Sequence, residues 1–280
     1  MRSFRKRLGE AARRNESWLC VGLDPDPAKL PEPLRSLPPL EAVERFLREI
    51  VEATRDLVCA YKPNSAFYEA LGPEGFSLLR RLIRGIVPEE IPVILDAKRG
   101  DIASTARKYA EAAFEGLGAD AVTVNPFLGF DAVEPFLRYE GRGVFLLCRT
   151  SNPGARDVQD LPCGGKPLYQ YIAERAVEWR TRHPEGGELG LVVGATYPEE
   201  VARVREIVED EMLLLVPGVG AQGGDLEKAV RAAANSRGEN ALVVAARSVL
   251  YASPQDDFAE AARREAERLR LALQSALGAE

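Results

Sequence analysis

The segment ILDAKRGDIASTARKYA places acidic and basic side chains directly after an apolar run, where ionisable groups are costly unless they are paired. Asp96 and Lys98 are two residues apart, so on a β-strand both side chains project to the same side. Asp101 follows after a turn at Gly100, and a second lysine, Lys62, follows the earlier apolar run VCAY. We therefore expect an alternating set of charges formed by Lys62, Asp96, Lys98 and Asp101.

The use of lysine in this set indicates proton transfer. The chain has seven lysines among its 37 lysines and arginines. A position that keeps lysine in such an arginine-rich chain is suited to giving up a proton, which arginine does not do in proteins. A salt-bridge network that only closes one end of the fold is the alternative, since paired lysines and carboxylates are common at surfaces.

The composition excludes several classes of protein and site. The chain has 280 residues, of which 46% are hydrophobic and 29% charged, as in a globular protein with a sizeable core. Its net charge of −6, without a basic tract, argues against nucleic-acid binding. The single histidine, His183, lies in the polar segment TRHPEGG. Catalysis by a Ser–His–Asp or Cys–His set, or a metal site with several histidines, is therefore not expected.

The sequence also predicts the compartment. No apolar run approaches the ~20 residues of a membrane span. The basic N-terminal stretch lacks the apolar core of a secretory signal and reads as an amphipathic helix, with Phe4, Leu8 and Ala12 on one face. The four cysteines form no C-x-x-C pair and are expected to be reduced thiols, mostly buried. We expect a cytoplasmic protein that binds neither membrane nor nucleic acid.

Short β-rich apolar runs recur along the whole chain with amphipathic, helix-patterned segments between them. Near-continuous apolar runs predict strands covered on both faces, as in parallel sheets. Eight such units predict an α/β fold, a (β/α)8 TIM barrel in a single domain over residues 1–280, with a helix before the first strand; a doubly wound sheet is the alternative. The predicted strands are Trp18–Leu23, Val58–Tyr61, Pro92–Leu95, Ala121–Val124, Gly143–Cys148, Leu189–Val193, Met212–Val216 and Ala241–Ala245.

Polar residues follow every predicted strand. In a barrel these positions converge on one face, which carries the active site. Turn preferences explain some of the Asn, Gly and Pro residues there, but not two lysines and two aspartates. After the fifth strand, residues 156–166 have no evident role, and we expect a mobile loop. The strand ends begin at Asp24, Lys62, Asp96, Asn125, Arg149, Gly194, Pro217 and Arg247.

Residues 96–105, DAKRGDIAST, resemble the D-x-K-x-x-D-I-x-x-T signature of orotidine 5'-monophosphate decarboxylases. The motifs VGLDPDP, YKPNSAFYE, VNPFLGFD, RTSNPGA and LVPGVGAQGGD are similar to those of the family's longer bacterial subgroup, type 2. The resemblance extends from about Trp18 to Tyr251. One departure is AARS after the eighth strand, where the wider family has a glycine–arginine pair, so the phosphate contact is assigned to Arg247 rather than Ala246.

The resemblance implies a lyase that needs no cofactor and no metal ion. It would convert orotidine 5'-monophosphate to uridine 5'-monophosphate and carbon dioxide, in the last step of de novo pyrimidine nucleotide synthesis. Loss of carbon dioxide from C6 leaves a poorly delocalised carbanion, which an adjacent ammonium can both stabilise and protonate. The resemblance gives this role to Lys98, with Lys62, Asp96 and Asp101 as the other catalytic residues that keep it charged and oriented.

The resemblance also implies how the nucleoside part of the substrate is held. Asp24, Asp101 and Thr105 are expected to contact ribose hydroxyls, and Asp101 and Thr105 would do so in the neighbouring subunit of a homodimer. Ser151 would read the pyrimidine edge, although a plain turn residue before Asn-Pro-Gly is the alternative. Asn125 is included among the substrate-binding residues.

The phosphate is expected at the loops after the seventh and eighth strands, the usual phosphate site of such barrels. The loop PGVGAQGGD offers backbone amides, including that of Gly220, and Arg247 follows one strand later. Gln222 would bridge the phosphate and the base.

Three other readings remain open. A Schiff-base aldolase would need a neutral lysine, whereas the flanking aspartates favour the protonated form. Related sugar-phosphate decarboxylases or aldolases share the D-x-K-x-x-D strand but use Mg²⁺, and the motifs RTSNPGA and GAQGG argue against them. A catalytically silent binding barrel would be expected to lack a member of the lysine–aspartate set, and none is missing.

Overall fold

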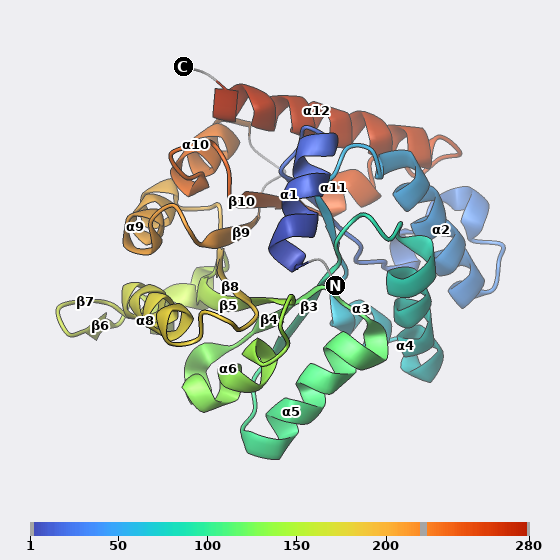
Figure 1. Ribbon diagram of the computed structural model, residues 1–280. Coiled ribbons are helices and arrows are strands. Elements are labelled where there is room, and N and C mark those ends of the chain that lie inside the picture. The colour runs from blue at the N-terminus through green and yellow to red at the C-terminus, as the bar shows by residue number, and fades with distance from the viewer. Residues whose placement is uncertain (1–2, 219–222, 279–280) are drawn as a thin grey trace.

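The computed structural model describes residues 3–218 and 223–278 and consists of a closed barrel of parallel strands inside a ring of helices (Figure 1). The strands are hydrogen-bonded in the order β2-β1-β10-β9-β8-β5-β4-β3. Bridges Tyr61↔Val93 and Asn64↔Asp96 join the two ends of this order, so the barrel closes. The predicted (β/α)8 barrel is confirmed.

The eight strands coincide with the eight predicted apolar runs, and two of them have the predicted bounds. The largest difference is β3, which continues through the charged residues Asp96 and Lys98 to Arg99 after a register shift against β4. The barrel strands are β1 (Leu19–Gly22), β2 (Ala60–Lys62), β3 (Ile94–Arg99), β4 (Ala121–Val124), β5 (Gly143–Arg149), β8 (Glu188–Val193), β9 (Leu213–Pro217) and β10 (Ala241–Ala245).

The outer helices bury one apolar stripe each against the sheet. In α2, for example, Val43, Phe46, Leu47 and Ile50 recur at helical spacing and are fully buried. The outer helices are α2 (Pro39–Thr54), α3 (Ser65–Glu69), α4 (Gly72–Arg81), α5 (Ala103–Glu111), α6 (Phe130–Leu137), α8 (Leu168–Arg182), α9 (Pro198–Val208), α10 (Gly223–Ala233), α11 (Arg247–Leu250) and α12 (Phe258–Gly278). Single turns of 3-10 or π-helix extend or precede several of them.

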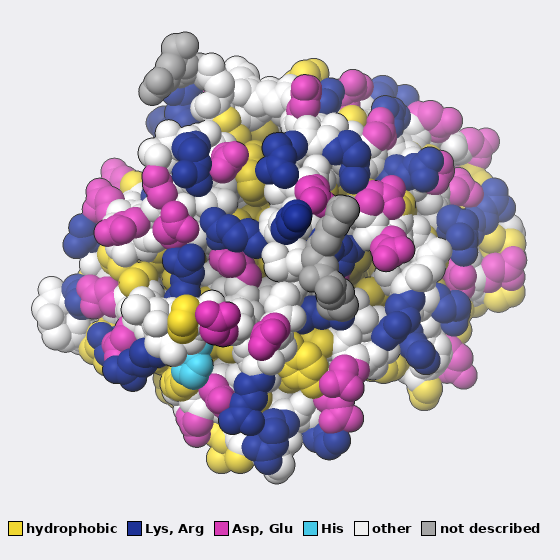
Figure 2. Space-filling view, in the orientation of Figure 1, with side chains coloured by type: hydrophobic (Ala, Val, Ile, Leu, Met, Phe, Trp, Pro, Cys, Tyr) yellow, Lys and Arg dark blue, Asp and Glu magenta, His cyan; other side chains and the backbone are white. Residues whose placement is uncertain are grey.

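The predicted N-terminal helix, α1 (Phe4–Arg14), closes the N-terminal end of the barrel and lies across the strands (Figure 1). Phe4 and Leu8 are buried with the inward-facing strand residues, and the Phe4 ring meets Phe145 edge-on at 5.9 Å. A Cβ on Gly143 would lie 2.6 Å from the Phe4 ring, so glycine is required where this helix packs. On the face that carries α1, acidic and basic side chains are interspersed (Figure 2).

The segment after β5, which we expected to be a loop, contains regular structure. Helix α7 (Arg156–Gln159) follows a 3-10 turn, and β6 (Pro162–Cys163) pairs antiparallel with β7 (Lys166–Pro167) in a hairpin. This hairpin projects beside α8 (Figure 1).

Two other expectations concern the whole chain. Cys20, Cys59 and Cys148 are buried, Cys163 is partly buried, and all four are free thiols. Within the part of the chain that the structure describes, no helix is long and apolar enough to cross a membrane.

Candidate active site

Lys62, Asp96 and Lys98 meet at the C-terminal mouth of the barrel. The ammonium of Lys62, at the end of β2, donates a hydrogen bond to Asp96 Oδ2 at 2.9 Å. The ammonium of Lys98 donates to the other carboxylate oxygen, Oδ1, at 2.6 Å. The Lys62 side chain is 7% exposed and that of Lys98 is 47% exposed. The buried lysine is therefore an anchor for Asp96, while the second lysine remains accessible from the cavity.

Thr123 completes this cluster and was not predicted. Its hydroxyl donates to Asp96 Oδ1 at 2.9 Å and accepts from the backbone N–H of Lys98 at the same distance. The residue is fully buried on β4. It is the one polar side chain in the run AVTV, and that was the available signal.

The backbone at Lys98 has an uncommon conformation, with a φ of 46°. A non-glycine residue in this left-handed region costs free energy and persists where surrounding contacts enforce it. The hydrogen bond from its N–H to Thr123 and the register shift of β3 fix the local geometry. The strand therefore bends at the residue whose ammonium returns to Asp96.

The charges of the cluster stabilise one another. Burial alone would raise the pKa of Asp96, but Lys62 and Lys98 outweigh it and lower that pKa to about 2. Burial likewise opposes the charge on Lys62, yet Asp96 and Asp24 raise its pKa above the ordinary value. Burial raises the pKa of Asp24 despite the nearby Lys62. The mouth thus keeps one carboxylate firmly ionised between two ammonium groups.

A cavity of about 440 Å³ opens above the cluster. The polar side chains of the cluster and of Thr150, Ser151, Asn152 and Gln159 line it together with the apolar side chains of Leu147, Val192 and Leu215. A concave site of mixed polarity fits a small planar polar molecule. Ser151, predicted to read a pyrimidine edge, lines this cavity together with Gln159, which was not predicted.

Asp24 lies next to the cluster, directly after β1. Its Oδ1 accepts the backbone N–H of Asn64 at 3.0 Å, and it is close enough to Lys62 to affect that group's pKa. The predicted contact of Asp24 to a ribose stays a prediction.

Besides Asp24 and Arg247, three other predicted residues do not line this cavity. Asp101 accepts a hydrogen bond from the N–H of Ile102 at the exposed rim, and Thr105 is exposed on α5. Asn125 accepts from the N–H of Phe127 and lines a neighbouring, mainly apolar cavity of about 580 Å³. None of the three lines the cavity above Lys98 in the described single chain.

The predicted phosphate site is described only in part. Arg247 is exposed at the start of α11, where its carbonyl accepts the N–H of Tyr251 at 3.1 Å, and its guanidinium has no hydrogen-bond or ion-pair partner among the described residues. Gly218, with a φ of +98°, adopts a conformation that favours glycine where the loop leaves β9. Gly220 and Gln222 lie outside the described residues.

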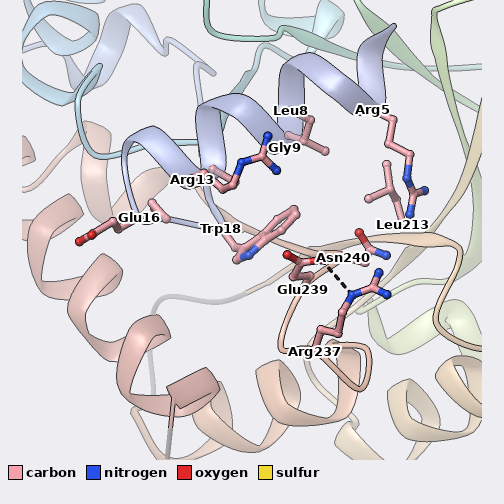
Figure 3. A pocket seen from close by; sticks show the side chains of 12 residues that line it. Arg5, Leu8, Gly9, Arg13, Glu16, Trp18, Leu213, Arg237, Glu239 and Asn240 are labelled. Carbon is pink, nitrogen blue, oxygen red and sulfur yellow. Dashed lines mark hydrogen bonds and ion pairs between the residues drawn. The ribbon is translucent and has the colours of Figure 1, made fainter.

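A further cavity, of about 340 Å³, lies at the opposite end of the barrel, beside α1 (Figure 3). Arg5, Arg13 and Trp18 line it, and Arg237 pairs with Glu239 there. No aspartate–lysine set lines it. Over residues 3–218 and 223–278, no group of His, Cys, Asp and Glu side chains could hold a metal ion.

The comparisons with known proteins agree on one family. The model described as Orotidine 5'-phosphate decarboxylase / HUMPS family matches residues 17–264. The chain is 54% identical over 276 residues to an orotidine 5'-phosphate decarboxylase of Roseiflexus sp., with 98% of each chain covered. It is also 54% identical over 264 residues to that of Cupriavidus necator, with 93% of this chain and 94% of the relative covered. The solved orotidine 5'-phosphate decarboxylase of Leishmania donovani superposes with a TM-score of 0.85 at 39% identity, covering 99% of this chain and 100% of that chain.

Proposed function

Because the chain belongs to the orotidine 5'-phosphate decarboxylase / HUMPS family, we propose that Lys98 delivers the proton that completes its reaction. That reaction is the decarboxylation of orotidine 5'-monophosphate to uridine 5'-monophosphate and carbon dioxide, the last step of de novo pyrimidine nucleotide synthesis. The observation that carries the proposal is the ammonium of Lys98, 2.6 Å from Asp96 and accessible from the cavity.

In the proposed mechanism, the bond between C6 and the carboxylate breaks and its electron pair stays on C6. The ammonium of Lys98 stabilises this carbanion and then transfers one proton from Nζ to C6, while carbon dioxide leaves. Asp96 and Lys62 orient the ammonium before the reaction, so little reorganisation is needed at the transition state. The half-exposed Lys98 amine can then regain a proton from solvent.

We further propose a homodimer in which Asp101 and Thr105 complete the neighbouring site. Both side chains reach the rim after β3 and do not line the chain's own cavity. Large apolar side chains are exposed on the same rim: Ile102 by 52% and Phe127 by 78%. A second copy covering them would bury this apolar surface.

The remaining contacts follow the strand ends. Asp24 would bind a ribose hydroxyl, Ser151 the pyrimidine edge, and Arg247 the phosphate, with the glycine-rich loop after β9. The guanidinium of Arg247 supports this assignment, because it is exposed and has no side-chain partner among the described residues, so it is available to bind a phosphate. The free thiols and the absence of a membrane-spanning helix among the described residues agree with the proposed cytoplasmic location.

The test is the ultraviolet absorbance of orotidine 5'-monophosphate mixed with purified protein and a chelator. We expect conversion to uridine 5'-monophosphate at an undiminished rate, because the proposed chemistry uses side chains alone. No conversion by well-folded protein, with or without Mg²⁺, would instead favour the magnesium-dependent sugar-phosphate branch. Ribulose- and hexulose-type phosphates would then be the substrates to assay.

A further inference from the structure

Helix α7 contributes a side chain to the lining of the cavity above Lys98. Its last residue, Gln159, lines the cavity together with Thr150, Ser151 and Asn152. The mechanism proposed above leaves this helix without a role. Its contacts indicate one.

Gln159 holds the turn that carries Ser151 through two hydrogen bonds to the same residue. Its Oε1 accepts the backbone N–H of Thr150 at 2.8 Å, and its Nε2 donates to the Thr150 hydroxyl at 2.9 Å. That hydroxyl donates in turn to Asn152 Oδ1 at 2.7 Å. The amide therefore fixes both the backbone and the side chain immediately before Ser151.

Arg149, the last residue of β5, holds Gln159 in place by a hydrogen bond. Its side chain is 1% exposed, and its Nε lies 2.6 Å from Glu200 Oε2 on α9. Its Nη1 donates to Gln159 Oε1 and its Nη2 to Asp160 Oδ2, both at 3.4 Å. One buried cation thus joins the end of β5 to α7 and α9. Burying a guanidinium is costly unless several partners hold it, so this arrangement is specific in geometry.

Tyr197, which precedes α9, reinforces the attachment of α7. The guanidinium of Arg149 lies 5.3 Å from the centre of its ring, and that of Arg156, the first residue of α7, lies 4.9 Å from it. Cation–π contacts on one ring therefore bind β5 and α7 to the loop after β8.

Ser151 is confined on its other side by close backbone packing. A Cβ on Gly194 would lie 2.8 Å from the Cβ of Ser151, and one on Gly218 would lie 3.5 Å from its Oγ. The turn is pressed against the ends of β8 and β9 and held there by α7. Functional side chains keep a productive geometry when neighbouring residues lock them in this way.

We infer that Gln159, anchored by Arg149, is a positioning residue that sets specificity for the pyrimidine by fixing the turn Thr150–Asn152. The inference rests on the proposed role of Ser151 in reading the base. It predicts that loss of the amide weakens recognition of the base but leaves the sugar phosphate unaffected.

The experiment compares Gln159→Leu with wild type by calorimetric binding of uridine 5'-monophosphate and of ribose 5-phosphate. Uridine 5'-monophosphate should bind about tenfold more weakly to the variant, which is the change in affinity expected when about one hydrogen bond to the base is lost. Ribose 5-phosphate should bind with unchanged affinity. Val158→Thr, at a half-exposed position on the same helix whose side chain makes no hydrogen bond to Thr150, is the matched control and should bind both ligands as wild type does. Arg149→Lys, which lacks the guanidinium fork, should show the same selective loss.

Equal weakening of both ligands by Gln159→Leu, or no weakening of either, overturns the inference, because a merely structural role does not separate base from sugar phosphate. Binding is measured without turnover, so the result is independent of the proposed reaction. If wild type fails to convert orotidine 5'-monophosphate but the selective loss persists, the decarboxylase proposal fails and the positioning inference stands.

Discussion

Asp96 and Asp120 each lie between two cationic side chains, at opposite ends of the same barrel. At the mouth, Asp96 binds Lys62 and Lys98. At the N-terminal end of the barrel, here called the base of the barrel, Asp120 directly precedes β4. It pairs with Arg7 of α1 and, at 3.3 Å, with Arg142. Both carboxylates are buried. The two clusters are alike in charge, so charge alone does not identify the reactive one.

The difference lies in the cations, because both clusters border a cavity, of about 440 Å³ at the mouth and of about 810 Å³ at the base. Arg7 also donates to the Glu89 carbonyl and Arg142 to the Ala119 carbonyl, and Asp120 accepts the Val93 N–H at 2.9 Å. Those contacts link α1 to the barrel. At the mouth, Lys98 faces a cavity and can lose a proton, which a guanidinium does not do. A cluster whose cation is a lysine beside a cavity is suited to proton transfer. A cluster whose cations are arginines that also bind backbone carbonyls is suited to stability.

The two carboxylates also differ in pKa. Lys62 and Lys98 overcome the effect of burial and lower the pKa of Asp96 to about 2. At Asp120, burial outweighs Arg7 and Arg142, and the pKa is raised. Lys62 is less exposed than either arginine, so its attraction is less screened by water.

The largest expected effect is that of Lys98→Ala at the mouth. It should reduce kcat/KM by at least about 10³-fold, because the substitution removes both the electrostatic stabilisation and the proton donor that we propose Lys98 supplies. The unfolding free energy should change by no more than about 1 kcal/mol, since the side chain is half exposed and Asp96 keeps Lys62. Steady-state kinetics and urea denaturation measure the two quantities.

The opposite outcome is expected for Asp120→Ala at the base. It leaves the buried Val93 N–H without its acceptor and removes the partner of two arginines, so we expect a loss of about 2–4 kcal/mol in unfolding free energy. The kcat/KM of the folded variant should stay within about threefold of wild type, since Asp120 does not line the cavity above Lys98. A large kinetic effect without a loss of stability would reverse the assignment of the two ends.

The third expected effect is a pH dependence of opposite sign at the two carboxylates. Asp96 has a lowered pKa in the folded state, so its contribution of about 2–3 kcal/mol is present above pH ~4 and is lost as the pH falls toward 2. The pKa of Asp120 is raised in the folded state. The folded protein therefore binds a proton at this carboxyl more readily than the unfolded chain does, and the unfolding free energy attributable to Asp120 rises as the pH falls through that pKa.

Denaturation of Asp96→Asn and Asp120→Asn between pH 7 and pH 3 tests this sign. The stability difference between wild type and Asp96→Asn should shrink as the pH falls, and that between wild type and Asp120→Asn should shift in favour of wild type. All other carboxylates are common to the variants and cancel. The same direction of change in both would show that the two environments do not differ as described.

The smallest expected effect is that of Arg7→Lys. A lysine can pair with Asp120 but cannot also reach the Glu89 carbonyl, so we expect a loss of about 1 kcal/mol in unfolding free energy and unchanged kinetics. Thermal and urea denaturation detect a change of this size. The base should therefore tolerate exchange of its cation.

The sequence predicted the barrel well because its strands are short apolar runs that end in polar residues. Ala121–Val124 and Ala241–Ala245 have the predicted bounds. The prediction ended β3 at Leu95, since charged residues follow, whereas the strand runs on to Arg99. Charges inside a strand are costly unless they are paired, and Asp96 finds partners in Lys62 and Thr123 on the neighbouring strands.

The site was predictable where spacing along one segment decides it, as for Asp96 and Lys98. Thr123, Arg149 and Gln159 were missed because their roles depend on which strand or helix lies beside them in space. Asn125 caps a 3-10 turn and does not line the cavity above Lys98. An asparagine directly after a strand is equally suited to either role. Contacts of Asp101 and Thr105 with a second subunit remain a prediction.

The most direct test of the central claim is the conversion of orotidine 5'-monophosphate by Lys98→Arg, followed by ultraviolet absorbance, with the unfolding free energy of the same preparation measured alongside. This exchange keeps the positive charge at the mouth and removes the transferable proton. We expect a folded protein of near wild-type stability whose conversion rate falls by at least about 10²-fold. Conversion at the wild-type rate would contradict the account, because the mouth would then need only a cation, as the base does.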